Sequence, residues 1–285
     1  MDPGRVYPHY TTIPKLVSGL DQASLESIQT LYSRIFTDVV PVSSPEVAEM
    51  TKLYENCQRM MCIAYANEMA DACAELSESL SSKLLKDRCS GSPQVHIDPW
   101  EVARAAATKP FGYMPYTPSL GVGGHCIPVN PYYLSSNAAF PLLTACTERM
   151  NDRPARIGDQ IMRRLDLESK EESLRNPSNR QKGILIVGLG FKSGQSVLSN
   201  SPGKAVATHL LSSYNVYVEF ADPLVCASAV SAIPRLNEKQ DWNVEYLVKK
   251  FDAVIVAVNQ PGLDMEVLRD AEKQGVLIQS FVKFA

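Results

Sequence analysis

The sequence has little of what several large classes of proteins require. No apolar run in its 285 residues approaches the roughly 20 residues of a transmembrane helix. The first residues, Met1 to Arg5, lack the apolar core of a secretion signal. The 28 basic and 31 acidic side chains give a net charge of −3, so a broad basic face for nucleic acid is not expected. We therefore predict no membrane partner and no nucleic-acid partner.

Cysteine and histidine are also used sparsely. The seven cysteines are scattered and form no Cys-x-x-Cys pair, and only four histidines are present, which argues against a zinc site. An odd number of dispersed cysteines is typical of reduced thiols in a cytoplasmic protein, mostly buried as small apolar side chains. We expect no bound metal and a cytoplasmic location. Cys126 is the expected exception among the thiols.

The first 167 residues are predicted to be mainly helical. Asp21 and Asp98 stand where helix N-caps are expected, and Pro45 follows Ser43 and Ser44 as a first helical residue. The predicted helices cover residues 22–36, 46–76, 141–167 and a stretch that begins at Pro99, with short strands near 13–19 and 38–42. The polar segment 77–95 is expected to be an exposed insertion. The glycine- and proline-rich segment 109–131 is expected to be a loop that lines a site.

The chain then changes character. A charged segment over residues 168–182 indicates a linker. After it, short apolar strands at 183–187, 216–220, 253–258 and 276–279 alternate with helices at 202–212, 242–249 and 265–273. Buried strands that alternate with helices predict a parallel sheet in a doubly wound, Rossmann-like α/β domain.

The long helix predicted from residue 46 has apolar residues on more than one side. Met50, Met60, Met61, Met69 and Leu76 cannot all face one neighbour. A second copy of the chain is the expected partner, so we predict a homodimer through this helix. The fold class that follows is α/β: a long central dimerisation helix in a helical region, followed by the Rossmann-like domain.

One segment stands out for its chemistry. Residues 121–134 read Gly-Val-Gly-Gly-His-Cys-Ile-Pro-Val-Asn-Pro-Tyr-Tyr-Leu. Glycines allow a backbone to approach a ligand closely, and Cys126 follows them in a loop. Nucleophilic thiolates are placed in this way.

This segment strongly resembles the nucleotide-sugar 6-dehydrogenases, the UDP-glucose/GDP-mannose dehydrogenase family, and most closely its UDP-N-acetylhexosamine branch. Further resemblance lies in residues 48–56 (Ala-Glu-Met-Thr-Lys-Leu-Tyr-Glu-Asn), Arg59, Asn67-Glu68, residues 109–115 (Lys-Pro-Phe-Gly-Tyr-Met-Pro), residues 188–192 (Gly-Leu-Gly-Phe-Lys) and Ser201-Pro202. Nearly the whole chain is covered. The resemblance divides it into 1–44, the tail of an amino-terminal domain, 45–167, the central dimerisation and active-site domain, linker 168–182, and 183–285, a UDP-binding type of domain.

The resemblance implies roles for individual residues. Cys126 matches the nucleophile that attacks a sugar aldehyde, and Lys52 and Asn56 match the residues that stabilise oxyanions. Their i, i+4 spacing puts them on one helix face. His125 and Asn130 flank the thiol, and the implied substrate-binding residues are Phe111, Gly112, Tyr113, Gly123, Gly124, Arg59 and Lys192. Without the motif, Lys52 would be a solvated lysine, and Asn67-Glu68 could equally be a packing pair.

Three departures from the family pattern matter. The family's NAD-binding domain with its G-x-G-x-x-G turn does not occur in this sequence, so no cofactor is expected unless another chain supplies NAD. The family's aspartate four residues after the cysteine is Asn130, which cannot relay a proton. An arginine expected near the Ser-Pro pair is Ser199, and the chain end lacks another, which weakens pyrophosphate binding.

Three functions remain open from the sequence. The first is a repurposed, NAD-independent enzyme that uses Cys126 and Lys52 on a carbonyl substrate in an isomerisation, cyclisation or addition. The second is a non-catalytic dimeric pseudoenzyme. The third is a UDP-sugar 6-dehydrogenase that needs an NAD domain in trans. The expected small-molecule partner is a nucleotide sugar or another carbonyl compound.

Overall fold

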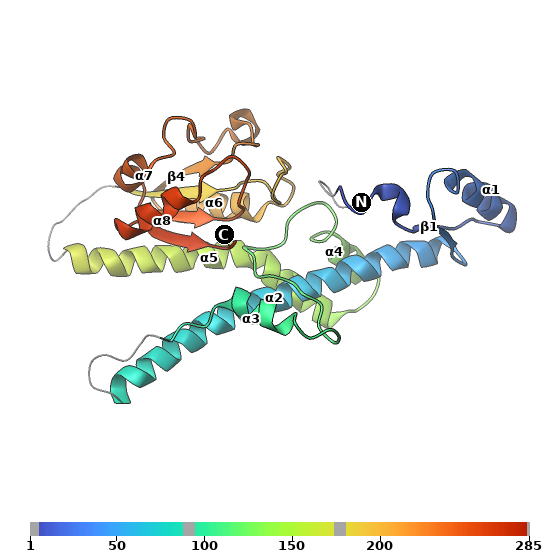
Figure 1. Cartoon of the computed structure of the whole chain (residues 1–285), viewed down its shortest axis with the longest axis horizontal. Coiled ribbons are helices and arrows are strands. Elements are labelled where there is room, and N and C mark those ends of the chain that lie inside the picture. The colour runs from blue at the N-terminus through green and yellow to red at the C-terminus, as the bar shows by residue number, and fades with distance from the viewer. Residues whose placement is uncertain (1–5, 88–94, 174–180, 284–285) are drawn as a thin grey trace.

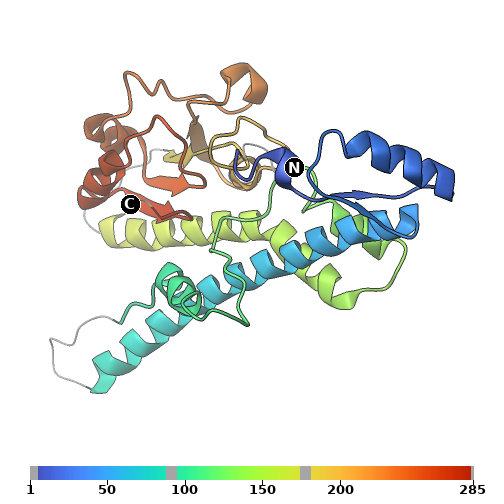
Figure 2. The same cartoon turned by 45° about the vertical axis from the view of Figure 1, so that its right-hand side comes forward.

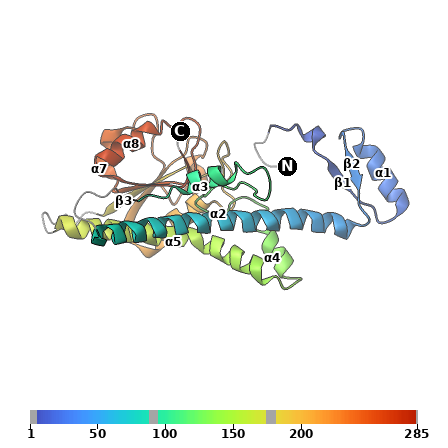
Figure 3. The ribbon, with the colours of Figure 1, turned by 60° about the horizontal axis from the view of Figure 1, so that its bottom comes forward.

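A long helix organises the whole molecule. The computed structural model describes residues 6–87, 95–173 and 181–283. Helix α2 (Pro45–Asp87) is the axis, with a small β-α-β unit at one end and helix α5 (Pro141–Ser173) crossing it farther along (Figure 1). The α/β domain lies on the second half of α5, away from the amino-terminal unit (Figure 3).

The amino-terminal unit contains strands β1 (Lys15–Val17) and β2 (Val39–Pro41) with helix α1 (Gln22–Tyr32) between them. The predicted cap is confirmed, because the Asp21 carboxylate accepts a hydrogen bond from Ser24 N and Ser24 Oγ bonds back. The two strands run parallel and pair with each other. They form a two-stranded sheet of their own.

Helix α2 is longer than its sequence predicts. It continues from Leu76 to Asp87, so the segment after residue 76 begins as helix and not as an exposed insertion. That segment lacks proline and glycine up to Asp87, and Ser77 and Ser82 donate to helix carbonyls one turn earlier. Buried Ser77 donates to Cys73 O (2.7 Å) and accepts from Ile97 N (2.9 Å), which holds the returning chain against α2.

Two shorter helices lie in the segment between α2 and α5. Helix α3 (Pro99–Ala106) begins at the predicted Asp98 cap, whose carboxylate accepts from Trp100 N, and it lies against the second half of α2 (Figure 2). The loop after it ends in helix α4 (Asn130–Ser135). Helix α5 extends to Ser173, into the segment expected to be a linker. Residues 88–94 and 174–180, on which part of the predicted insertion and linker fall, lie outside the described residues.

The α/β domain has the predicted doubly wound architecture. Its strands β3 (Lys182–Val187), β4 (Val216–Ala221), β5 (Ala253–Val256) and β6 (Leu277–Ser280) are all parallel, in the order β4-β3-β5-β6. Helices α6 (Pro202–Ser213), α7 (Val244–Lys250) and α8 (Glu266–Lys273) complete it. The sheet has a buried cluster on each face, as expected for parallel strands covered on both sides.

Helix α5 belongs to two cores at once. Its first half contributes Leu143 and Met150 to a cluster with Cys57 and Met60 of α2. Its second half contributes Ile157, Ile161 and Leu165 to the core under α6. The central helices and the α/β domain are therefore joined by one continuous helix with apolar contacts on both sides.

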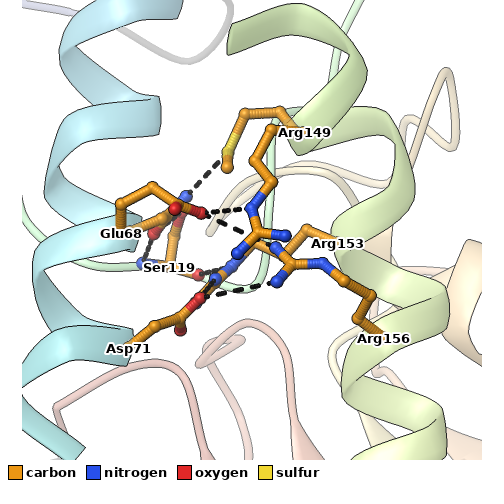
Figure 4. Close-up of polar contacts among 8 residues, drawn as sticks. Glu68, Asp71, Ser119, Arg149, Arg153 and Arg156 are labelled. Atoms are coloured by element: carbon orange, nitrogen blue, oxygen red, sulfur yellow. Dashed lines mark hydrogen bonds and ion pairs between the residues drawn. The ribbon is translucent and has the colours of Figure 1, made fainter. Parts of the chain in front are cut away.

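Charged residues accompany the crossing of α2 and α5 (Figure 4). Arg153 of α5 is 2% exposed, and its guanidinium donates to Asp71 of α2 (2.6 Å) and to Ser119 O (3.4 Å). Arg149 donates to Glu68 (2.7 Å). Burial and the neighbouring Arg149 lower the pKa of Arg156, which reaches the same two acids only at 3.7 and 4.0 Å.

No described helix is long and apolar enough to cross a membrane. Within the described ranges, no three His, Cys, Asp or Glu side chains gather as metal ligands would. Among the described cysteines, Cys57 and Cys73 are buried, Cys62 and Cys146 are half-buried, and Cys126 and Cys226 are exposed. Thus only some of the cysteines that the sequence predicts to be mostly buried are buried in the structure.

The Arg153 contact generates a test of the crossing. We expect Asp71→Asn to lower the free energy of unfolding by about 2–3 kcal/mol, because it leaves a buried guanidinium without its anion. Arg153→Met should cost less, since it removes the buried charge together with its need for a partner and keeps an apolar side chain of similar length. Urea unfolding of both variants measures the difference. If Arg153→Met loses more unfolding free energy than Asp71→Asn, Asp71 is not the partner that makes the buried Arg153 charge tolerable.

Candidate functional site

The sequence-predicted nucleophile lies on a surface loop. We call residues 119–129 the thiol loop. Cys126 is exposed, and its carbonyl accepts hydrogen bonds from Val129 N (3.2 Å) and Asn130 N (2.8 Å). The second bond ties Cys126 to the first residue of α4. A short helix thus holds the backbone of the nucleophile candidate while its sulfur faces solvent.

Two asparagines join the thiol loop to the central helix. Asn56 of α2 is buried and donates from Nδ2 to Asn130 Oδ1 at 2.6 Å. Lys52 lies one helical turn before Asn56 on the same face and is exposed. Arg59, also on α2, is exposed. The structure therefore brings Asn56, Asn130 and Cys126 into one bonded chain, with the ammonium of Lys52 on the adjoining turn.

The glycines of the thiol loop approach another protein segment closely. A Cβ on Gly123 would stand 2.8 Å from Phe191 Cβ, and one on Gly124 would stand 3.1 Å from the Phe191 ring. Gly124 also has a φ of 94°, which disfavours any side chain. Gly124 N donates to Ser199 O (2.9 Å), and Asn200 Nδ2 donates to Gly124 O (2.9 Å). The two predicted substrate-binding glycines thus form the contact between the thiol loop and the α/β domain.

The segment that receives these glycines follows β3, and we call residues 188–201 the β3–α6 loop. Its Gly188-Leu189-Gly190 sequence looks like part of a dinucleotide turn. Its N–H groups are already used, because Leu189 N and Gly190 N donate to the carboxylate of Asp222 at 2.7 and 2.9 Å. A phosphate would have to displace that buried carboxylate to bind there.

A cavity of about 300 Å³ opens beside this loop. It lies at the carboxyl ends of β3 and β5, where the strand order reverses, which is the usual ligand position in an open parallel sheet. The residues that line it come from the start of the thiol loop, the β3–α6 loop, α6 and the ends of β5 and β6: Ser119, Leu120, Gly121, Phe191, Ser193, Pro202, Gly203, Ala257, Val258, Asn259 and Val282. The cavity therefore has both domains in its wall.

None of the predicted site residues is among those that line this cavity. Gly112 and Tyr113 line a different, largely apolar cleft of about 470 Å³ between α2 and α3. Phe111 is 70% exposed, with Lys109 Nζ 4.9 Å from its ring centre. His125 is exposed, and Lys192 is half-buried in the β3–α6 loop. Asn67 is fully buried and accepts from Ser119 N (2.7 Å), so the Asn67-Glu68 pair is in the packing between helices.

The thiols differ in their readiness to react. Burial raises the pKa of Cys57 and Cys73, and burial together with Glu68 raises the pKa of Cys146, which keeps all three protonated. A hydrogen bond with Ser228 lowers the pKa of exposed Cys226. Cys126 and Cys226 are therefore the two described exposed thiols, and any labelling experiment must separate them.

Sequence reasoning missed several residues that shape the site. Asp222 and Phe191 hold the two loops together, and Arg153 holds Ser119 at the start of the thiol loop. Asp222 had a signal, an acid placed directly after a buried strand, and Phe191 stands in the Gly-Leu-Gly-Phe-Lys motif. Arg153 looks like an ordinary surface helix arginine in the sequence.

Fold and site together define a two-domain α/β protein with a cysteine on the loop where a helical domain meets an open parallel sheet. Residues 46–82 and 90–152 match the central domain of the UDP-glucose/GDP-mannose dehydrogenase family. The chain belongs to this family, as the resemblance of its motifs indicates.

Individual relatives agree with that assignment. The chain is 31% identical over 232 residues to UDP-N-acetyl-D-glucosamine 6-dehydrogenase of Pseudomonas aeruginosa, which is 80% of this chain and 48% of the relative. It is 27% identical to UDP-N-acetyl-D-mannosamine dehydrogenase of Pyrococcus horikoshii over 91% of this chain and 53% of that protein. The chain thus spans about half the length of these relatives.

A solved structure shows the same fold. The UDP-D-ManNAc dehydrogenase structure from Pyrococcus horikoshii superimposes with a TM-score of 0.73 at 24% identity, covering 100% of this chain and 60% of that one. At this level of identity the similarity concerns the fold alone.

The Asn56–Asn130 contact generates a prediction. In Asn130→Asp, a carboxylate would accept the Asn56 hydrogen bond at the start of α4, where negative charge is favourable. We expect a gain of about 0.5–1 kcal/mol in unfolding free energy at pH 7, which disappears as the pH falls below about 4 and the carboxyl is protonated. Denaturant melts at pH 7 and pH 3.5 test this. Asn130→Ala is the control and should lose stability at both pH values, because it leaves buried Asn56 unpaired.

Proposed function

We propose that this chain binds a nucleotide sugar that already carries an aldehyde at C6 in the cavity between the thiol loop and the β3–α6 loop, and that Cys126 adds reversibly to that aldehyde carbon. The observation that carries the proposal is the direct packing of the thiol loop on the nucleotide-side loop through Gly123, Gly124 and Phe191. A ligand in the cavity beside Phe191 would therefore meet a thiol loop whose position is already set.

The proposed addition balances without an oxidant. The sulfur of the Cys126 thiolate forms a bond to the carbonyl carbon, the C=O π pair moves to oxygen, and a proton completes a thiohemiacetal. In this proposal the ammonium of exposed Lys52 stabilises the developing alkoxide. Asn56 donates a hydrogen bond to Asn130, the residue after the thiol loop. An asparagine at position 130 does not act as a base, so the proposal stops at the addition step.

NAD does not fit the described residues. The one glycine turn of the α/β domain that follows a buried strand has given two of its N–H groups to Asp222. The loop between β1 and α1 has Gly19 only, and a Cβ there would stand 2.4 Å from Leu25 N. A dehydrogenase reaction of this chain would take its NAD from another polypeptide segment and would use the same thiol.

The proposal is tested with a UDP-sugar that carries a ¹³C-labelled aldehyde at C6. We expect the bound aldehyde carbon to shift to the resonance of a thiohemiacetal, which Cys126→Ala abolishes. Lys52→Ala should reduce the adduct population by about tenfold through loss of alkoxide stabilisation. NMR measures the adduct, and calorimetric titration with UDP measures binding separately.

Cys226→Ala is the matched control, because it removes the other exposed thiol and should leave the adduct intact. UDP binding with no adduct would reduce the function to binding and contradict the proposed chemistry. Absence of both UDP binding and the adduct would overturn the whole proposal.

We also propose that two copies pair through α2. Exposed apolar side chains follow one side of this helix, within an arc of about 120° at 100° per residue: Met50, Tyr54, Tyr65, Met69, Leu76 and Leu80. The apolar cleft between α2 and α3 adjoins Tyr65 and Met69. A stripe of this length on one helix suits the same stripe of a second copy, as a two-fold interface requires.

The pairing predicts a mass of twice 31.4 kDa in light-scattering chromatography. We expect Met69→Lys to shift the protein to the monomer mass, because it places a charge in the centre of the apolar stripe. Glu78→Lys is the control: Glu78 is exposed on the opposite side of α2, nine residues on, and the dimer should persist. A wild-type monomer at micromolar concentration would refute the pairing.

A further inference from the structure

Asp222 is a buried carboxylate with no part in the proposed chemistry. It stands at the carboxyl end of β4 and is 0% exposed. Its Oδ2 accepts from Leu189 N (2.7 Å), Gly190 N (2.9 Å) and Gln260 Nε2 (3.1 Å), and its Oδ1 accepts from Leu224 N (2.9 Å). Both oxygens are therefore satisfied by N–H donors of the protein itself, as buried polar groups generally are.

Gln260 extends this anchor along the β3–α6 loop. It is 1% exposed, its Oε1 accepts from Gly194 N (2.9 Å), and its Nε2 also donates to Gln195 O (3.0 Å). From the other side, buried Ser201 donates to Leu189 O (2.6 Å). The backbone of the loop is thus bonded at its beginning, middle and end.

The thiol loop packs against this β3–α6 loop. Phe191 directly follows the two residues that Asp222 binds, and its Cβ lies against Gly123 and its ring against Gly124. Ser199 and Asn200, at the far end of the loop, bond to the backbone of Gly124. A displacement of residues 189–191 would move Phe191 into glycines that have no space to spare. Cys126 follows two residues later in the chain.

We propose that Asp222 is a positioning residue for the thiol loop: it acts through Leu189, Gly190 and Phe191 to fix Gly124 and thereby the place of Cys126. Asp222 itself touches neither the thiol nor the cavity lining. The inference rests on the proposed function only in treating Cys126 as the reactive thiol. The contacts between the β3–α6 loop and the thiol loop form without any ligand.

A neighbouring acid provides a matched control. Glu219 lies three residues earlier in β4 and is also buried, but its carboxylate bonds to Lys250 Nζ (2.6 Å) and to the Tyr217 hydroxyl. Lys250 is the last residue of α7, and Tyr217 lies in β4 itself. Glu219→Gln therefore disturbs the same strand without touching the β3–α6 loop.

The experiment measures hydrogen exchange of the Gly124 amide in the full chain without ligand, under conditions where global unfolding is rare. We expect Asp222→Ala to speed this exchange by at least about tenfold, because Ser199 no longer holds the amide steadily. Asp222→Asn keeps one acceptor oxygen and should give an intermediate increase. Glu219→Gln should leave the exchange unchanged even where it lowers the melting temperature as much.

A second measurement links the coupling to chemistry. The alkylation rate of Cys126 by iodoacetamide, read by mass spectrometry of the Cys126 peptide, should change at least threefold in Asp222→Ala and stay unchanged in Glu219→Gln. Unchanged Gly124 exchange in both Asp222 variants overturns the inference, as does equal acceleration in Glu219→Gln. Because neither readout uses UDP, failure of nucleotide-sugar binding would leave this test intact.

Discussion

The buried guanidinium of Arg153 is the interaction on which the rest of the structure depends. It joins Asp71 of α2 to Ser119 O, and Ser119 N in turn bonds to fully buried Asn67 (Figure 4). One cation thus fixes the crossing of the two long helices and the start of the thiol loop. A charge taken out of water is tolerated only with partners of this quality, so the helices have few alternative arrangements.

The site follows from that crossing. Helix α5 continues from the crossing into the core of the α/β domain, so the sheet has a fixed position relative to α2. The glycines of the thiol loop then close the remaining gap to Phe191. Glycine is required here by the approach of another loop, with a φ of 94° at Gly124 adding a second reason. The nucleophile candidate therefore depends on contacts between domains as much as on its own sequence motif.

Local sequence patterns predicted the elements well and their ends less well. Strand and helix alternation after residue 182 predicted every strand of the parallel sheet, and Asp21 and Asp98 cap the helices they were expected to cap. The extension of α2 beyond Leu76 was missed, because polar residues without a breaker are compatible with helix as well as loop. Of the predicted site, Asn56 and Asn130 do meet, whereas Gly112 and Tyr113 line a separate cleft.

By itself the sequence determined the order of elements, the doubly wound sheet and the identity of the thiol loop, because periodicity, caps and glycine are local properties of the chain. Only the tertiary structure decided which partners the loop N–H groups and the buried charged side chains bind. Asp222 takes the N–H groups that the glycine turn offers, and Arg153 takes the anion of α2. Such pairings join residues far apart in sequence, and a buried polar group accepts whichever partner the packing brings within reach.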